Sequence, residues 1–188
     1  MALREPARTP REARERYVRY LQRSLSCLSN GQWIVGRPPF PRSSDEELAL
    51  TLSEDPLRLR RRSQEGAVLL KAAQRFEVVP DDRFEGEWKV ATRGYLYDLA
   101  IEMSSGRVTR ELASWHWHPP GRARPHLHVY AEHPIPGVSF RRLHLPTGRV
   151  AFEEIVRLLI DELDVRPDRD DWEAVLGEPE ARFRLFRS

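Results

Sequence analysis

All six histidines of the 188-residue chain fall within one window of 29 residues. Four of them form two His-x-His pairs, which stand on either side of a short stretch rich in Pro and Gly. An imidazole can act as an acid or a base near neutral pH, and it is also the commonest side-chain ligand of transition metals. The window therefore predicts a functional site. The candidate residues are His116, His118, His126 and His128, with His133 and His144 as outer candidates.

The spacing within each pair fits a β-strand, on which residues two apart point to the same face. The intervening residues would then point into the core; they are Trp115, Trp117, Leu127 and Val129. The loop from Pro119 to Pro125 is short enough to join two neighbouring antiparallel strands. We expect His118 opposite His126 and His116 opposite His128, with the Cβ atoms of each pair about 4.5–5.5 Å apart. Four imidazoles would then share one face of the hairpin.

Such a face suits two kinds of chemistry. Three or four imidazoles can bind one divalent transition metal such as zinc, although Glu111 and Glu132 are the only carboxylates nearby in the sequence. Alternatively, two of the histidines can serve as base and acid in phosphodiester cleavage. Residues 104–149 contain seven arginines and two glutamates, which favours an anionic ligand. The expected substrate-binding residues are Arg122, Arg124, Tyr130 and Arg149.

The surrounding sequence predicts an α+β fold, in which an antiparallel meander carries an N-terminal helix and C-terminal helices packed on one face. We expect a single domain over 1–188, with a helical arm and Pro-rich linker over 1–43 and an α+β core over 44–188. The predicted elements are a helix over 10–29, a hairpin of 48–52 with 57–59, a helix followed by a strand over 66–79, strands over 95–103, 108–118 and 126–131, and helices over 151–164 and near 170–176.

Composition limits the class of protein. Hydrophobic residues make up 40% and charged residues 32% of the chain, as in globular proteins. No apolar run approaches the roughly 20 residues that cross a bilayer, so no membrane association is expected. The first residues lack the apolar stretch of a signal peptide. The single cysteine, Cys27, excludes an internal disulfide, and a cytoplasmic location is expected.

Three short motifs and one helix carry a resemblance to a known family. The motifs are Tyr95-Leu96-Tyr97, Trp115-His116-Trp117-His118 and Pro125-His126-Leu127-His128, and the helix begins at about residue 151. Over residues 87–165 the chain resembles the small TumE-type toxins of bacterial toxin–antitoxin pairs. The Arg-Tyr-Asp-like run that precedes the histidines in that family is absent. The resemblance implies an RNA-directed nuclease with a cognate antitoxin or another protein as partner.

A second likeness is to ubiquitin-conjugating folds, which share an N-terminal helix, a meander and a histidine–proline corner such as His144-Leu145-Pro146. The acceptor cysteine that should follow this corner is missing, because Cys27 lies far upstream. The leading hypothesis is therefore a histidine/arginine site that acts on a phosphate-bearing ligand, RNA above all. The alternative is a metal- or protein-binding module without catalytic activity, a cysteine-less relative of ubiquitin-conjugating folds.

Overall fold

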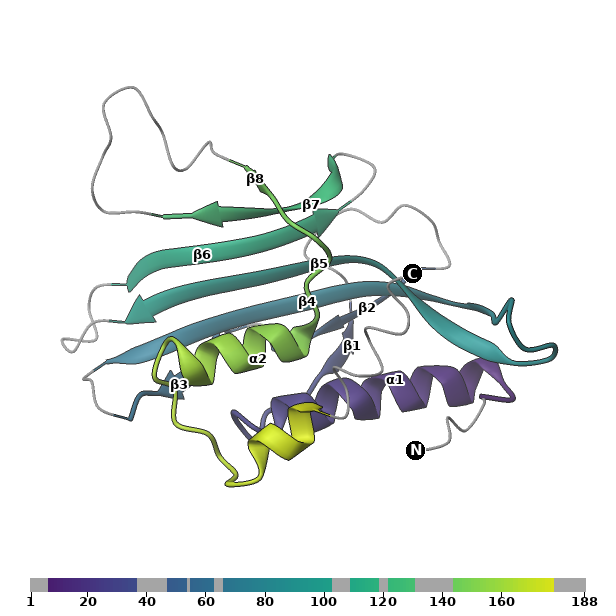
Figure 1. The fold of residues 1–188 in the computed structure, drawn as a ribbon, viewed down its shortest axis with the longest axis horizontal. Helices are drawn as coiled ribbons and strands as arrows, with labels where there is room; N and C mark the ends of the chain where they lie inside the picture. The colour runs from purple at the N-terminus through teal and green to yellow at the C-terminus, as the bar shows by residue number, and fades with distance from the viewer. Residues whose placement is uncertain are drawn as a thin grey trace.

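A single antiparallel sheet dominates the structure (Figure 1). The computed structural model describes residues 7–36, 47–53, 55–62, 66–102, 109–118, 122–130 and 144–177. The sheet has eight strands in the order β1-β2-β4-β5-β6-β7-β8, and β3 also pairs with β4. The strands are β1 (Ile34–Gly36), β2 (Leu48–Thr51), β3 (Leu57–Arg60), β4 (Ala67–Pro80), β5 (Trp88–Glu102), β6 (Thr109–His118), β7 (Arg122–Val129) and β8 (Leu145–Pro146).

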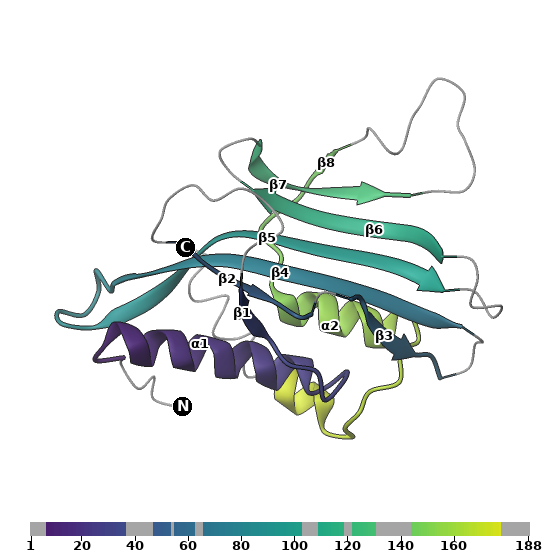
Figure 2. The ribbon, with the colours of Figure 1, turned by 180° about the vertical axis from the view of Figure 1, so that it is seen from behind.

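Two helices, α1 (Pro10–Leu25) and α2 (Phe152–Asp161), cover one face of this sheet (Figures 1 and 2). Helix α1 begins as the sequence predicts, because the Thr9 hydroxyl accepts a 3.1 Å hydrogen bond from the backbone N–H of Glu12. The helix that the sequence places in an N-terminal arm packs on the sheet, and its Leu21 and Leu25 are fully buried. The predicted α+β architecture is confirmed.

The hydrophobic core lies between the helices and the sheet. Strand β5 contributes Tyr95 and Tyr97, and β6 contributes Trp115 and Trp117. The ring of Phe152 in α2 lies 6.0 Å from the Tyr97 ring, centroid to centroid. Both predicted core tryptophans are buried, with 9% and 6% of their surface exposed. The alternating pattern therefore leaves the histidines of the same strand on the opposite face, away from the helices.

Two predicted elements are wrong. Residues 66–79 do not start with a helix, because 67–80 form the single long strand β4. Residues 72–76 are buried on both faces of the sheet, so the period of two that marks a strand is lost there. The predicted hairpin of 48–52 with 57–59 also does not form. Strands β2 and β3 instead pair with different halves of β4 and lie one after the other along it.

The remaining predicted elements occur near their expected positions. A short helical segment over 172–177 buries Val175 and Leu176, as predicted. The C-terminal residues 183–186, which the sequence predicts to pack, lie outside the described residues. No helix in the described part of the chain is long and apolar enough to cross a membrane.

Candidate functional site

Strands β6 and β7 pair through the candidate histidines, in a register different from the predicted one. The Cα partners are Ser114 with His128, His116 with His126, and His118 with Arg122, with an irregularity between His116 and His118. The predicted register is wrong: the partner of His116 is two residues away from the expected one and that of His118 is four residues away, both even numbers. A shift by an even number of residues keeps every side chain on its face. The expectation that the histidines share one face is therefore met.

Five histidines form one group, here called the histidine cluster: His116, His118, His126, His128 and His144. The ring centroids of His116 and His126 lie 5.7 Å apart, and those of His116 and His128 lie 5.1 Å apart. The ring centroid of His118 lies 5.7 Å from that of His116 and 5.8 Å from that of His126. The predicted site residues on β6 and β7 are thus neighbours in space.

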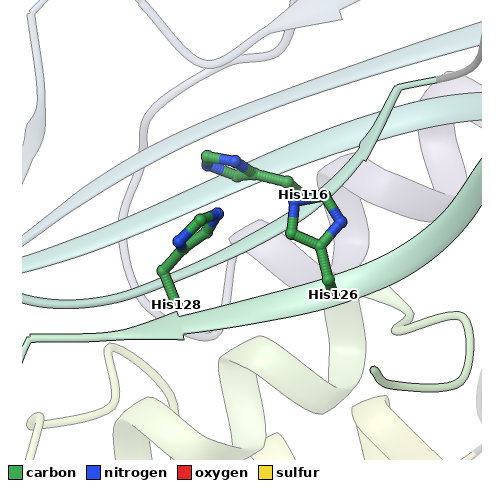
Figure 3. Close-up of side chains that lie close together, drawn as sticks. All are labelled: His116, His126 and His128. Atoms are coloured by element: carbon green, nitrogen blue, oxygen red, sulfur yellow. The ribbon is translucent and has the colours of Figure 1, made fainter. Parts of the chain in front are cut away.

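Three members of the cluster have the geometry of a metal site. One ring nitrogen from each of His116, His126 and His128 lies within 4.8 Å of the others (Figure 3). A tetrahedral zinc ion with Zn–N bonds of about 2.0–2.1 Å needs donor atoms about 3.3–3.4 Å apart. To bind such an ion the nitrogens must therefore approach one another by about 1.5 Å at most. Among the residues that the structure describes, this is the one such group of three.

The burial of the three histidines suits metal binding as well. His126 and His128 are 4% and 8% exposed, while the side chain of His116 is 21% exposed. Two of the three proposed ligands are therefore shielded from bulk water, and the third is partly exposed. The Nδ1 atom of His126 lies 3.1 Å from the Arg124 carbonyl oxygen. If Nδ1–H donates to that carbonyl, the lone pair of Nε2 is left for a metal.

A carboxylate on β5 orients the third histidine. The Nε2 atom of His116 lies 3.2 Å from Oδ1 of Asp98. Burial alone would raise the pKa of Asp98, but hydrogen bonds from His116 and Ser114 outweigh it and hold this pKa below its usual value. Lys71, opposite Asp98 on β4, lowers the pKa further. A charged acceptor at Nε2 keeps the proton there and leaves Nδ1 of His116 for a metal.

Asp98 is not among the residues that the sequence predicts for the site, because Glu111 and Glu132 are the carboxylates that lie near the histidines in the sequence. The signal was present: Asp98 interrupts an apolar strand at a position whose side chain points away from Tyr97. Its Cα partner is Ser114, two residues from His116 on the same face of β6. Recognising the pair from sequence requires the register of β5 with β6. Glu111 is exposed, and Glu132 lies outside the described residues.

His144, an outer candidate in the sequence, belongs to the histidine cluster. Its ring centroid lies 4.3 Å from that of His128 and 4.9 Å from that of His126. Strand β8 places it there. Leu145 pairs with Leu127, and because the two strands are antiparallel, the neighbouring residues His144 and His128 also lie opposite each other. The other outer candidate, His133, lies outside the described residues.

The four predicted substrate-binding residues do not all lie on the same side of the sheet. Arg124 is exposed on β7, in the stretch where the pairing with β6 is irregular, and Tyr130 is half-buried just after the strand. The Cα atom of Arg122 lies opposite that of His118 in the strand pairing. The guanidinium of Arg149 lies 4.2 Å from the ring centroid of Trp117. Trp117 faces the helices, so Arg149 is on the side of the sheet opposite to the histidine cluster.

No protein-family model, curated protein or solved structure matches the chain. The resemblances to TumE-type toxins and to ubiquitin-conjugating folds therefore stay predictions. What the site does must be argued from its own geometry.

Proposed function

We propose that this protein binds one divalent first-row transition metal, with zinc as the best fit, through His116, His126 and His128. The observation that carries the proposal is the convergence of three imidazole nitrogens to within 4.8 Å on rigid, paired strands. Imidazole ligands suit zinc, copper, nickel and iron rather than magnesium or calcium. The hydrogen bonds at His116 and His126 support the same assignment, because metal-binding histidines usually donate their second N–H to a carboxylate or a carbonyl.

We further propose that the metal is presented to a phosphate-bearing ligand. Three protein ligands leave a position of a tetrahedral ion for a water molecule or a substrate. Arg124 is exposed on β7, and its carbonyl oxygen lies 3.1 Å from Nδ1 of His126. A planar guanidinium beside a metal suits a phosphate group, because it donates two parallel hydrogen bonds. The metal supplies Lewis acidity and lowers the pKa of a bound water.

A second candidate function is RNA cleavage by histidine acid–base chemistry without a metal. The observation in its favour is the contact between the rings of His116 and His126, with Arg124 two residues away on β7. Cleavage would begin when one histidine removes the proton from the ribose 2′-hydroxyl, whose oxygen then attacks phosphorus. The other histidine would protonate the departing 5′-oxygen as the P–O bond breaks. RNA, an antitoxin partner and a cytoplasmic location remain predictions from the sequence.

The two candidates differ in their response to chelators. Cleavage of a single-stranded RNA probe that persists after dialysis against EDTA supports acid–base chemistry. Cleavage or phosphate binding that disappears on dialysis and returns with zinc supports the metal centre.

Elemental analysis tests the metal proposal directly. Protein purified without a polyhistidine tag and equilibrated with zinc should retain about one equivalent, and His126→Ala should retain far less. His118→Ala is the matched control: it removes a histidine of the same cluster that lies outside the group of three, and it should keep the zinc. The proposal fails if the wild type retains no metal, or if His126→Ala and the wild type retain the same amount.

A further inference from the structure

The segment over 144–150 passes around the edge of the sheet from one face to the other. At its start, His144 lies on the histidine face, against His126 and His128. At its end, the backbone N–H of Val150 donates a 3.0 Å hydrogen bond to the Tyr95 hydroxyl on the helix face. Between these ends the backbone N–H of Thr147 donates to the Pro125 carbonyl at 3.0 Å. Figure 1 shows β8 at this edge, beyond β7, with the chain continuing to α2.

The two ends of this segment are held unequally. The end near α2 has both the Val150 hydrogen bond and the packing of Arg149 on Trp117. The histidine end pairs with β7 through the two residue pairs of β8, which is the shortest strand of the sheet. His116, His126 and His128 stand on strands of eight residues or more. His144 therefore lies next to a much shorter strand than those that carry the other three histidines.

The ring of His144 lies beside two of the three proposed ligands, although it is not one of the three histidines whose ring nitrogens converge. Its centroid distances to His128 and His126, 4.3 and 4.9 Å, are the shortest within the histidine cluster. His118, the other histidine outside the group of three, lies 5.7 Å or more from its neighbours. Zinc with four nitrogen ligands forms a closed site, whereas a metal that acts on a ligand needs an exchangeable position.

We propose that His144 is a fourth, displaceable ligand of the metal, which an incoming phosphate group replaces. In the resting protein the metal binds the ring of His144 and thereby fastens β8 to β7. When phosphate binds, one metal–nitrogen bond breaks and one metal–oxygen bond forms, with no change in oxidation state. This inference depends on the metal centre proposed above. It adds that the segment over 144–150 controls access of the ligand to that centre.

Cobalt(II) replaces zinc as a visible probe in this experiment, because its absorption spectrum reports coordination number and ligand type. Apoprotein of the wild type, His144→Gln and His118→Gln is titrated with Co²⁺, and each loaded protein is then titrated with inorganic phosphate. We expect His144→Gln to bind Co²⁺ at least about tenfold more weakly. Even the loss of a group that only hydrogen-bonds a metal ligand lowers metal affinity by about 10- to 100-fold. We also expect phosphate to alter its spectrum at a concentration several-fold lower than in the wild type. His118→Gln should match the wild type in both titrations.

The outcomes separate this inference from the metal centre itself. If no variant and no wild-type protein binds Co²⁺, the metal centre is wrong and the inference falls with it. If the wild type binds Co²⁺ and His144→Gln gives the same affinity, spectrum and phosphate response, the metal centre stands and the role of His144 is wrong. Circular dichroism of each apoprotein identifies a variant that fails to fold, and His144→Asn then replaces it.

Discussion

The hydrogen bond between Asp98 and His116 decides which nitrogen of His116 faces the cluster. A neutral imidazole has one N–H and one lone pair, and the carboxylate of Asp98 holds the N–H at Nε2. The charged carboxylate also makes the ring a stronger donor to a metal. Asp98 therefore acts on the proposed metal through His116, without touching it.

Replacing Asp98 with Asn should weaken zinc binding by about 10- to 100-fold, the usual effect of losing such a supporting carboxylate. The stoichiometry of about one zinc should not change, because all three imidazoles remain. Competition with a zinc-binding dye measures the affinity. Asp171→Asn removes an exposed carboxylate that pairs with Arg169 far from the site, and it should bind zinc as the wild type does. Equal affinities of Asp98→Asn and wild type would exclude this role of Asp98.

At the scale of residues, the alternation of histidine with tryptophan or leucine was enough to predict that His116, His126 and His128 share a face. It did not predict Asp98 or His144, because both join the site from other strands. Their positions depend on the registers of β5 with β6 and of β7 with β8. Register follows from loop geometry and packing rather than from the pattern of any one strand.

A buried ion pair between β4 and the residue that precedes β2 lies over a glycine of β5. The guanidinium of Arg75 on β4 is fully buried and donates to Glu47 at 3.0 Å. It lies over Gly94 on β5, where a Cβ atom would come within 2.9 Å of Nη2 of Arg75 and 2.6 Å of the Trp117 carbonyl oxygen. Only glycine leaves room for both neighbours. This packing supports the end of β6 that carries His118.

Gly94→Ala should destabilise the protein by about 1–3 kcal/mol, the usual range for an added carbon in a well-packed site. The backbone oxygen of Trp117 cannot move away without distorting β6. Urea denaturation followed by tryptophan fluorescence measures the change. Gly177→Ala is the control, because no atom lies within 4 Å of the added Cβ there, and its stability should stay within about 0.5 kcal/mol of the wild type. Unchanged stability of Gly94→Ala would show that the site relaxes freely.

At the scale of elements, long strands with strict alternation, such as β5 and β6, could be predicted from sequence. Strand β4 could not, because Ala72, Ala73 and Phe76 are buried along with the polar Gln74 and Arg75. A short run that is buried on both faces has no period of two and fits a helix equally well. The β2–β3 hairpin was predicted because β4 was not expected to be a long strand. Strand β4 is long enough to pair with both β2 and β3.

At the scale of the whole molecule, a buried polar layer lies where α2 meets α1. Glu153 of α2 is 2% exposed, and its Oε1 accepts a 3.1 Å hydrogen bond from the Ser24 hydroxyl of α1. Burial raises the pKa of the Glu153 carboxyl, because it outweighs the hydrogen bonds from Tyr20 and Ser24, and the charge of Glu154 raises it further. Burial likewise raises the pKa of Tyr20, and the nearby Glu153 adds to this effect.

This layer predicts how stability depends on pH. The folded state holds the Glu153 proton more tightly than the unfolded chain, whose carboxyl has the ordinary value near 4.5. The stability contributed by the neutral carboxyl is therefore fully present below that value, and it is lost as pH rises through the higher pKa of the folded state. Glu153→Gln should be more stable than the wild type at neutral pH, and the difference should shrink towards pH 4. Thermal unfolding across this pH range measures both curves.

The exposed Glu173 offers a matched control for that comparison. Glu173→Gln should follow the wild-type curve at every pH. A wild type that gains stability as pH rises from 4.5 to 7 relative to Glu153→Gln would reverse the predicted sign and contradict the account of Glu153.

X-ray absorption at the zinc edge tests the metal centre most directly, because it reports the atoms bound to the ion. We predict a first shell of about three to four nitrogen atoms at about 2.0–2.1 Å, with the outer-shell scattering that imidazole rings produce. His128→Ala should lose part of this imidazole signal. A first shell made of oxygen atoms alone, or an imidazole signal that is unchanged in His128→Ala, would contradict a zinc centre built on His116, His126 and His128.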